Sequence, residues 1–438
     1  MNLNPEFQRQ LYLECSQARL IGIPLVLGII FTFTYFIDGY QLGSFTAKAA
    51  LTLFMLITLL WGARQTIDSV IEEYRERTWD TQRLSALAPW EMTWGKLLGS
   101  TIMVWYSAII CLLTYSVANH NTSQLPILLF YCICVALIVQ SASLLLGLLA
   151  IQRGQTKSGS IFLLAVIGFL LIAPWLADLS DASYYMQPIS TIDWYGMLFA
   201  TDYFHRISLL LILFWCNVGN YRLMTQELGM RTQPWAWLGF ILFLIIYLGG
   251  FIPNSSYPFS LATFGVCSTL TYVGILVERN DAMRIRRLST YLSRHNWQRA
   301  SEEIPIWWLS FVLMLPFAFW LSLSDHPLSQ FSTTFHFYPL AIVLILLRDC
   351  AIYLYFLYGK NPQRAFSLTL LVGALLYGVI PGIFNAVGQH SLSALFFPLW
   401  AESTGGALIC ATLQTGFVVN LLYHRWKLNI GFSKINSR

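Results

Sequence analysis

Long apolar runs recur along this chain and are separated by short polar segments. A run of about 20 predominantly apolar residues is long enough to form a helix that crosses a bilayer. Such runs lie approximately at 20–38, 46–66, 97–118, 125–151, 160–178, 206–225, 233–252, 259–278, 306–325, 334–358, 366–387 and 402–424. The pattern therefore predicts an all-α polytopic membrane protein with about twelve transmembrane helices.

The composition agrees with this prediction. The 438 residues are 56% hydrophobic and 11% charged, and the mean hydropathy is +0.59. Soluble domains carry about 25% charged residues, so the lipid bilayer is the first expected partner. The net charge of +5 does not indicate a nucleic-acid partner, because the basic residues lie in short loops between the apolar runs.

The distribution of basic residues predicts how the chain is oriented. Loops on the cytoplasmic side of membrane proteins are enriched in Lys and Arg. If the N-terminus lies inside, only Lys48 and Arg206 of the 26 basic residues fall near the outer face. One span more or fewer would invert everything after it. The asymmetry therefore predicts both termini in the cytoplasm and an integral protein of the plasma membrane, which in bacteria is the inner membrane.

The apolar runs fall into two sets of six, in residues 1–225 and 226–438. In each set the second run is followed by the longest inner loop, at 67–96 and at 279–305. Two six-helix halves in parallel repeat are a common plan among transporters. The pattern predicts a duplication, although alternating loop lengths can also coincide by chance.

A short motif recurs in the two inner loops. Glu76-Arg77 and Arg83-Leu84-Ser85 in the first loop resemble Glu278-Arg279 and Arg287-Leu288-Ser289 in the second. The second copies lie 202 and 204 residues further along, so the match requires a two-residue insertion. The motif favours the duplication.

The first inner loop is predicted to form a helix, a turn and a second helix at the inner membrane surface. Charged residues recur near helical spacing and extend the second span, at Asp68, Glu72, Arg75, Glu76 and Arg83. An apolar stripe follows, formed by Leu84, Leu87 and Trp90. Pro89 followed by Glu91 is typical of a new helix start. An interfacial helix that only anchors the loop would show the same pattern.

The sequence from Thr78 to Leu97 resembles the coupling segment of ABC-2 type exporter permeases. That family typically has Glu, a small residue and Thr-Trp, then an apolar stretch with Pro, then Ser-Pro-x-Glu-φ-x-φ-Gly-Lys-Leu, where φ is apolar. The matching residues are Glu76, Thr78, Trp79, Leu84, Pro89, Glu91, Met92, Gly95, Lys96 and Leu97. Arg77 stands where the family usually has Gly, and Ala86 where it often has a first Pro.

The N-terminus extends the resemblance. Asn4-Pro5-Glu6-Phe7, with Arg9 and Glu14, is similar to the amphipathic entry helix that precedes the first span in that family. The resemblance covers roughly residues 1–225. The second half matches only in layout, because its loop 279–305 has no Gly-Lys at its end.

The resemblance implies that this chain is the transmembrane subunit of an ABC exporter. A separate ATPase, expected as a dimer, would dock on the coupling segment, and its closure on ATP would move the attached spans. The residues expected to couple are Glu72, Glu73, Glu76, Arg77, Thr78, Trp79, Asp80, Arg83, Leu84, Pro89, Trp90, Glu91, Gly95 and Lys96. Whether a second permease copy is required stays open.

The chain itself is not expected to be an enzyme. A phosphate-binding loop needs Gly-x-x-x-x-Gly-Lys-Ser/Thr, and Gly95-Lys96 is followed by Leu97. ATP and Mg would therefore bind to the partner ATPase, and no cofactor or metal is expected in this chain. The residues that contact the transported substrate, and the substrate itself, are unknown from the sequence.

The second inner loop is strongly basic. Arg284, Arg286, Arg287 and Arg294 are expected either to anchor the loop at anionic lipid headgroups or to form a second docking surface. Within the spans, Arg348 and Asp349 lie toward the inner end of the tenth run, where we expect the arginine to snorkel and to pair locally. No buried proton relay is predicted.

Two other functions remain open. A secondary carrier of the major-facilitator type also has two six-helix halves, but it expects Gly-x-x-x-Asp-Arg-x-Gly-Arg between its second and third spans, which loop 67–96 lacks. A membrane-embedded glycosyl or acyl transferase would need clustered carboxylates or histidines at one membrane face. The acidic residues predicted to lie outside are scattered.

Overall fold

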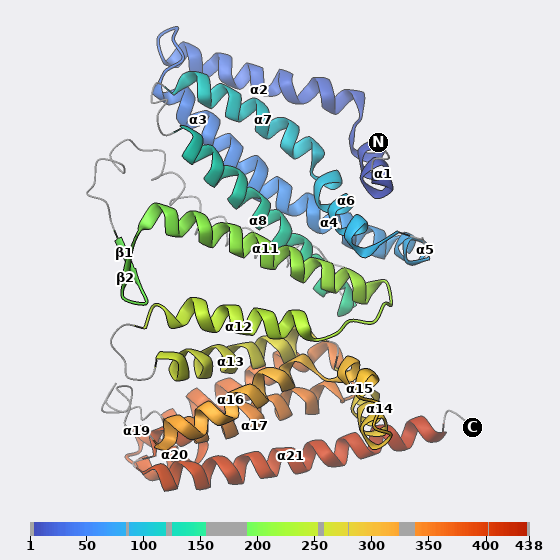
Figure 1. The fold of residues 1–438 in the computed structure, drawn as a ribbon, viewed down its shortest axis with the longest axis vertical. Coiled ribbons are helices and arrows are strands. Elements are labelled where there is room, and N and C mark those ends of the chain that lie inside the picture. Colours follow the sequence, from blue (N-terminus) through green and yellow to red (C-terminus); the bar gives the residue numbers. More distant parts are fainter. Residues whose placement is uncertain are drawn as a thin grey trace. The chain divides into compact units, whose positions relative to one another are not determined.

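The computed structural model describes residues 4–84, 87–119, 125–154, 191–252, 258–278, 280–323, 338–401 and 403–435. These residues are almost entirely helical, which confirms the all-α class (Figure 1). One short hairpin, β1 (Thr191–Trp194) and β2 (Met197–Ala200), is a small exception. The chain divides into two compact units. Unit 1 comprises Met1–Ile192 and Leu198–Thr232, and unit 2 comprises Asp193–Met197 and Gln233–Arg438.

Unit 1 is a bundle of long helices preceded by a short amphipathic one. Its helices are α1 (Pro5–Glu14), α2 (Gln17–Ile37), α3 (Ser44–Met55), the π-helical turn η1 (Leu56–Trp61), α4 (Gly62–Arg75), α5 (Thr78–Arg83), α6 (Pro89–Ser100), α7 (Ile102–Ala118), α8 (Leu125–Gln152) and α11 (Thr201–Glu227). α3, η1 and α4 form one continuous helix of 32 residues. The expectation that the helix of the second apolar run continues into the charged residues that follow it is therefore confirmed.

A buried polar contact fixes the centre of unit 1. Gln140 of α8 donates to the backbone carbonyl of Thr58 in η1 at 3.4 Å and accepts from the Trp105 indole at 3.1 Å. Gly62 makes room for this amide, because a Cβ there would lie 2.7 Å from Gln140 Nε2. Side-chain hydrogen bonds and small residues of this kind hold helices together where the surroundings are apolar.

Unit 2 has a similar order of elements. Its helices are α12 (Trp235–Gly249), α13 (Pro258–Val277), α14 (Ala282–Ser293), α15 (Trp297–Glu303), α16 (Ile306–Leu323), α17 (Pro339–Leu357), η3 (Pro362–Arg364), α18 (Ala365–Ala374), the π-helical turn η4 (Leu375–Val379), α19 (Ile380–Ala386), α20 (His390–Phe396), η5 (Pro398–Trp400) and α21 (Thr404–Ile435). The apolar core lies between α12, α13, α16 and α17.

The described residues contain nine helices that are long and apolar enough to cross a membrane. The count becomes ten if α6 and α7, which meet at 51°, form one broken span. The apolar helix α12 is shorter, with 15 residues, and the predicted span 160–178 lies outside the described residues. The structure thus confirms an apolar, membrane-type helical protein, while the number twelve stays a prediction.

Several helix pairs of unit 1 have a counterpart in unit 2. In unit 1, α2 packs on α3 and α7, α3 on α7, α4 on α8, and α8 on α11. In unit 2, α12 packs on α13 and α16, α13 on α16 and α17, and α17 on α21. These are the pairs that a parallel duplication predicts, and the duplication itself remains a proposal.

Candidate functional site

The segment between α4 and α6 forms the predicted helix, turn and helix. α4 ends at Arg75, α5 covers Thr78–Arg83, and α6 begins with Pro89 at its first position. The Glu91 carboxylate accepts a hydrogen bond at 3.3 Å from the backbone N–H of Ala88, which stabilises this start. Residues 85 and 86, including the position where the family often has a first Pro, lie outside the described residues.

The predicted apolar stripe is wrong. α5 ends at Arg83, so Leu84 and Leu87 lie outside a helix, and Trp90 belongs to the next one. The Leu84 side chain is 89% exposed. The spacing was misleading because the chain leaves the helical path before Pro89, as residues that precede a proline commonly do.

Arg77 makes the sharp turn between α4 and α5. Its backbone is left-handed, with φ 60° and ψ 13°. Only glycine adopts this region without a steric penalty. The position where the resembling family usually has Gly is therefore one that needs a left-handed residue, and the turn is made here despite the arginine side chain.

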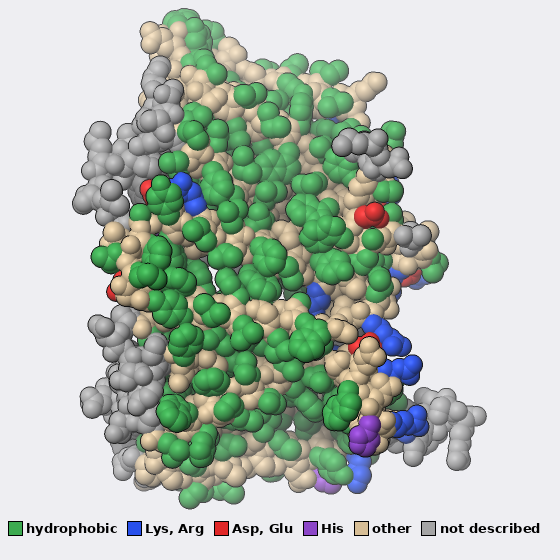
Figure 2. Space-filling model, viewed as in Figure 1, with side chains coloured by type: hydrophobic (Ala, Val, Ile, Leu, Met, Phe, Trp, Pro, Cys, Tyr) green, Lys and Arg blue, Asp and Glu red, His purple; other side chains and the backbone are tan. Residues whose placement is uncertain are grey.

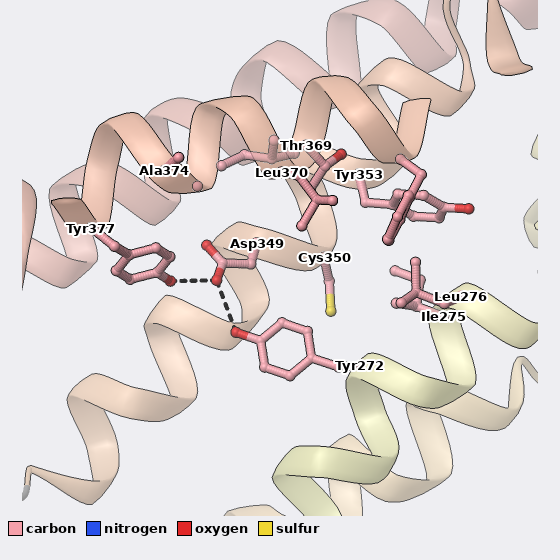
Figure 3. A pocket seen from close by; sticks show the side chains of 13 residues that line it. Tyr272, Ile275, Leu276, Asp349, Cys350, Tyr353, Thr369, Leu370, Ala374 and Tyr377 are labelled. Atoms are coloured by element: carbon pink, nitrogen blue, oxygen red, sulfur yellow. Dashed lines mark hydrogen bonds between the residues drawn. The ribbon is translucent and has the colours of Figure 1, made fainter. Parts of the chain in front are cut away.

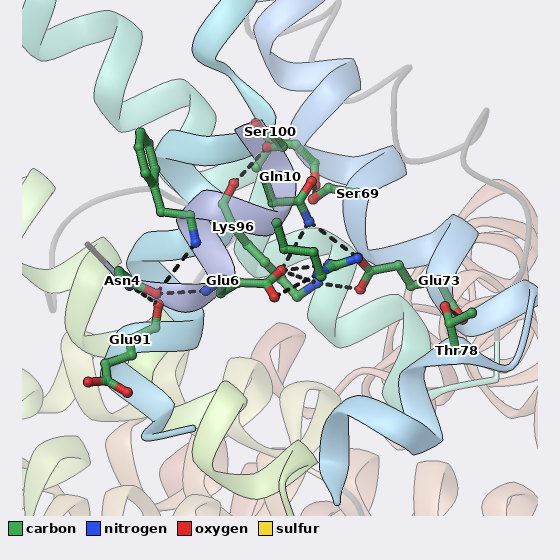
Figure 4. Close-up of polar contacts among 12 residues, drawn as sticks. Asn4, Glu6, Gln10, Ser69, Glu73, Thr78, Glu91, Lys96 and Ser100 are labelled. Carbon is green, nitrogen blue, oxygen red and sulfur yellow. Dashed lines mark hydrogen bonds and ion pairs between the residues drawn. The ribbon is translucent and has the colours of Figure 1, made fainter. Parts of the chain in front are cut away.

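Four charged side chains meet next to this turn, at the contacts of α6 with α1 and α4 (Figure 4). Lys96 of α6 pairs with Glu73 of α4, and its Nζ lies 3.3 Å from Glu6 Oε1 of α1. Arg9 donates to both Glu6 oxygens, at 2.7 and 2.9 Å, and also to Glu73. Gln10 Nε2 adds a bond of 3.0 Å to Glu6. We call Glu6, Arg9, Gln10, Glu73 and Lys96 the buried ion-pair network.

The network is largely shielded from solvent and its charges balance. Lys96 is fully buried and Glu6 is 2% exposed, whereas Arg9 is 38% exposed. Burial raises the pKa of Glu6, but the hydrogen bond from Arg9 and the charge of Lys96 outweigh it and hold the pKa below its ordinary value. The hydrogen bond to Glu6 in turn raises the pKa of Arg9. Glu6 and Arg9 therefore stay ionised at neutral pH.

Two glycines allow α1 to approach α6 closely. A Cβ on Gly95 would lie 2.6 Å from the Glu6 Cβ, and a Cβ on Gly99 would lie 2.6 Å from the Gln10 Cβ. Real Cβ atoms do not approach this closely, so a larger residue would push α1 away. Asn4 completes the contact, since its side chain caps α1 and donates to the Glu91 carbonyl at 2.6 Å.

Trp79 anchors α5 to the rest of unit 1. The side chain is 1% exposed and packs in a core cluster with Val70, Met92 and Leu97. The Lys96 Nζ lies 5.1 Å from the centre of its ring, within the range of a cation–π contact. Because Trp79 points inward, the polar residues on either side of it in α5 face outward.

The structure divides the predicted coupling residues into two groups. The exposed group comprises Glu72, Glu76, Arg77, Thr78, Asp80, Arg83, Leu84, Trp90 and Glu91. The buried or half-buried group comprises Glu73, Trp79, Pro89, Gly95 and Lys96. The second group lies against the chain's own helices and supports the exposed residues from below. Glu6, Arg9 and Gln10 complete this support. The sequence placed Glu6 and Arg9 in the entry helix but did not predict their contacts, and it did not single out Gln10.

The second inner loop uses half of its predicted arginines internally. Arg284 donates to Glu278 at 2.6 Å and to the Glu303 carbonyl at 2.9 Å. Arg287 binds the Glu303 carboxylate at 2.9 Å, and this hydrogen bond raises the pKa of Arg287. These pairs close α14 onto α15. Arg286 and Arg294 of the predicted set are exposed, and Arg287, although paired, is also 46% exposed. Figure 2 shows basic side chains gathered over α14 and α15.

The expectation that Arg348 snorkels is wrong. Arg348 is the middle residue of α17, and its side chain is 1% exposed. The predicted local pairing is confirmed, because Arg348 donates to Asp349 Oδ1 at 2.8 and 3.0 Å. A buried charged cluster within a span was missed because its other members, Tyr272, Tyr377 and Gln414, come from three other elements.

Comparisons with known proteins leave the resemblance resting on its motif. No family model matches the chain, and no curated protein or solved structure matches it. Among the described residues, no group of three or more His, Cys, Asp or Glu side chains is placed to hold a metal ion.

Proposed function

We propose that this chain is the permease subunit of an ATP-binding-cassette exporter, and that a separate ATPase docks on the exposed residues around α5. The observation that carries the proposal is that buried contacts attach this exposed surface to three helices of unit 1. The buried ion-pair network joins α1, α4 and α6 beneath it. The buried side chain of Trp79 packs α5 against residues of α4 and α6.

The packing of α1, α4 and α6 is suited to transmitting movement from α5 to the long apolar helices. α4 is continuous with α3, α6 leads into α7 through Thr101, and α1 is followed by α2 after two residues. Each of the three helices joined by the network thus leads directly into one long apolar helix. A partner that moves α5 would move the ends of three spans together, because breaking the buried ion pairs costs several kcal/mol.

The exposed surface offers specific contacts to a protein partner. It carries both signs of charge, with Glu76, Asp80 and Arg83 exposed beside the apolar Leu84. Protein interfaces combine an apolar centre with a polar rim, and this surface offers both kinds of contact. ATP and Mg would bind to the partner ATPase, whose two copies would close on ATP.

Charge reversal tests the docking role. In the double variant Glu76→Lys and Asp80→Lys, we expect loss of copurification with the ATPase and loss of permease-stimulated ATP hydrolysis. The fold should persist, since exposed charges contribute about 0–1 kcal/mol to stability. Lys48→Glu is the matched control, because it reverses an exposed charge near the start of the continuous helix Ser44–Arg75, at the end far from α5. Unchanged ATPase binding and stimulation in the double variant would overturn the proposal.

The duplication and the orientation belong to the same proposal. Both termini would face the cytoplasm, and the loop containing α14 would be the counterpart of α5, with Arg286 and Arg294 as its remaining free contacts. Cysteines introduced at Ser123 and Ser329 should react with an impermeant reagent from outside, and one at Ser289 only from inside. The reverse pattern would contradict the orientation. Reversing Arg286 and Arg294 should weaken ATPase binding less than the change at α5.

One observation favours the second candidate, a secondary carrier. Ion-driven carriers hold ionisable groups inside their spans, and Arg348 with Asp349 is such a pair. Transport by the purified chain in ATP-free vesicles under a proton or sodium gradient would support the carrier. Transport that requires ATP and the partner would support the exporter. No described feature favours the transferase.

A further inference from the structure

A buried charged cluster ties together five elements of unit 2. Arg348 donates to Asp349 within α17 and to Gln414 of α21. The other Asp349 oxygen accepts from Tyr272 of α13 at 2.8 Å and from Tyr377 of η4. Gln414 donates in turn to the backbone carbonyl of Phe396 in α20 at 3.3 Å. Ionisable groups at such a depth are costly and usually serve a function.

A cavity of about 510 Å³ opens beside Asp349 (Figure 3). Its volume lies in the range of sites that bind small molecules. The walls come from α13, α17, α18 and η4, all within unit 2, and are mainly apolar and aromatic. They include Tyr272, Leu276, Asp349, Tyr353, Phe366 and Tyr377.

The cavity reaches the apolar outer surface of α18. Phe366 and Leu370 line it, yet their side chains are 46% and 58% exposed. A ligand could therefore enter from the hydrocarbon region of the bilayer. The π-helical turn η4 presents Tyr377 at the inner wall, and turns of this kind are frequent at functional sites.

Three hydroxyl groups of the wall are arranged to accept hydrogen bonds from a ligand. Tyr272 and Tyr377 use their hydroxyl hydrogens on Asp349, and Thr369 uses its own on the Ala365 carbonyl at 2.8 Å. The tyrosine oxygens keep lone pairs that can accept from a ligand. A ligand head group that binds these three hydroxyls must therefore be a donor.

The charge of the wall favours a neutral ligand. Asp349 already accepts two hydrogen bonds from Arg348, so its charge is compensated. Arg348 does not line this cavity. An ammonium group would lose its hydration without gaining an unpaired carboxylate, and a carboxylate would meet no donor on these three hydroxyls.

We propose that this cavity binds a neutral lipophilic alcohol, with its hydroxyl on Tyr272 and Tyr377 and its hydrocarbon body against α18. The site requires neither the proposed ATPase nor any direction of transport. It would select its ligand by one donated hydrogen bond and by the length of the apolar body.

Photolabelling of the purified full chain in detergent tests this site. The probe is a long-chain primary alcohol with a diazirine in its chain, and labelled peptides are mapped by mass spectrometry. We expect labels in α17 and α18. Unlabelled alcohol should compete about two- to tenfold better than its methyl ether, since the ether has lost one donated hydrogen bond. Equal competition by the ether, or stronger competition by the matching amine or fatty acid, would overturn the proposal.

Matched glycine variants test the location. Gly373 lines the cavity, and a Cβ there has only ordinary contact with Tyr377 at 3.9 Å. Gly373→Leu should therefore fill the cavity and reduce labelling at least tenfold. Gly382→Leu is the control, because that glycine has open space around it and does not line the cavity. Tyr272→Phe with Tyr377→Phe should retain labelling but lose the preference for alcohol over ether. Labelling that Gly373→Leu leaves unchanged would overturn the assignment, and the wild-type selectivity test stands even if a variant fails to fold.

Discussion

Replacing Lys96 with methionine isolates the energetic role of the buried ion-pair network. Methionine has a similar length but no charge, so Lys96→Met leaves Glu6 and Glu73 with Arg9 as their sole cation within the network. Lys96 is fully buried and Glu6 is 2% exposed, so solvent screens the remaining carboxylates poorly. Removing one partner of a buried pair typically costs about 3–5 kcal/mol. We expect the free energy of unfolding to fall by that amount.

The measurement is denaturant unfolding of the purified protein in detergent, followed by tryptophan fluorescence. Lys48→Met, which removes an exposed lysine, should change the free energy of unfolding by less than about 0.5 kcal/mol. Adding Glu73→Gln to Lys96→Met removes the carboxylate that lost its nearest cation, and should recover about half of the loss. A loss below about 1 kcal/mol for Lys96→Met, or no recovery in the double variant, would refute the view that these charges are buried and mutually compensated.

Three further predictions concern the same region. Gly95→Ala should destabilise the protein by about 1–3 kcal/mol in the same unfolding assay, because the new Cβ would overlap Glu6. The control Gly22→Ala should leave stability unchanged, because a Cβ there meets nothing within 4 Å. Equal effects of the two substitutions would argue against close packing of α1 on α6. Arg77→Gly should stabilise the protein by up to about 1 kcal/mol and Arg77→Val should destabilise it, because φ at this residue is 60°. A valine variant as stable as the glycine variant would contradict the left-handed turn. The pKa of Glu6 is lowered in the folded protein, so Glu6 contributes to the free energy of unfolding above its ordinary pKa of 4.5, and this contribution is lost as the pH falls below 4.5. On acidification, the free energy of unfolding should therefore fall more steeply in the wild type than in Glu6→Gln. Parallel curves for the two proteins would count against this linkage.

Local sequence patterns were sufficient for the helices themselves. The long apolar runs gave the apolar helices, the charged spacing after the second run gave the continuation of α4, and Pro89 with Glu91 gave the start of α6. Each of these features depends on residues within a few positions of one another, because helix formation and helix starts are governed by near neighbours. The predicted stripe through Leu84 was wrong because the spacing of apolar residues does not show where a helix ends.

The roles of the charged residues were decided only by tertiary structure. In the sequence, nothing distinguished Lys96 and Glu73 from Glu76 and Asp80. In the structure α1, which lies more than 60 residues before Glu73 in the chain, covers Lys96 and Glu73 and leaves Glu76 and Asp80 exposed. Arg348 was expected at a membrane surface, but Tyr272, Tyr377 and Gln414 enclose its ion pair at the middle of a helix. Burial of a charge depends on which distant groups can compensate it, and a pattern of near neighbours does not contain that information.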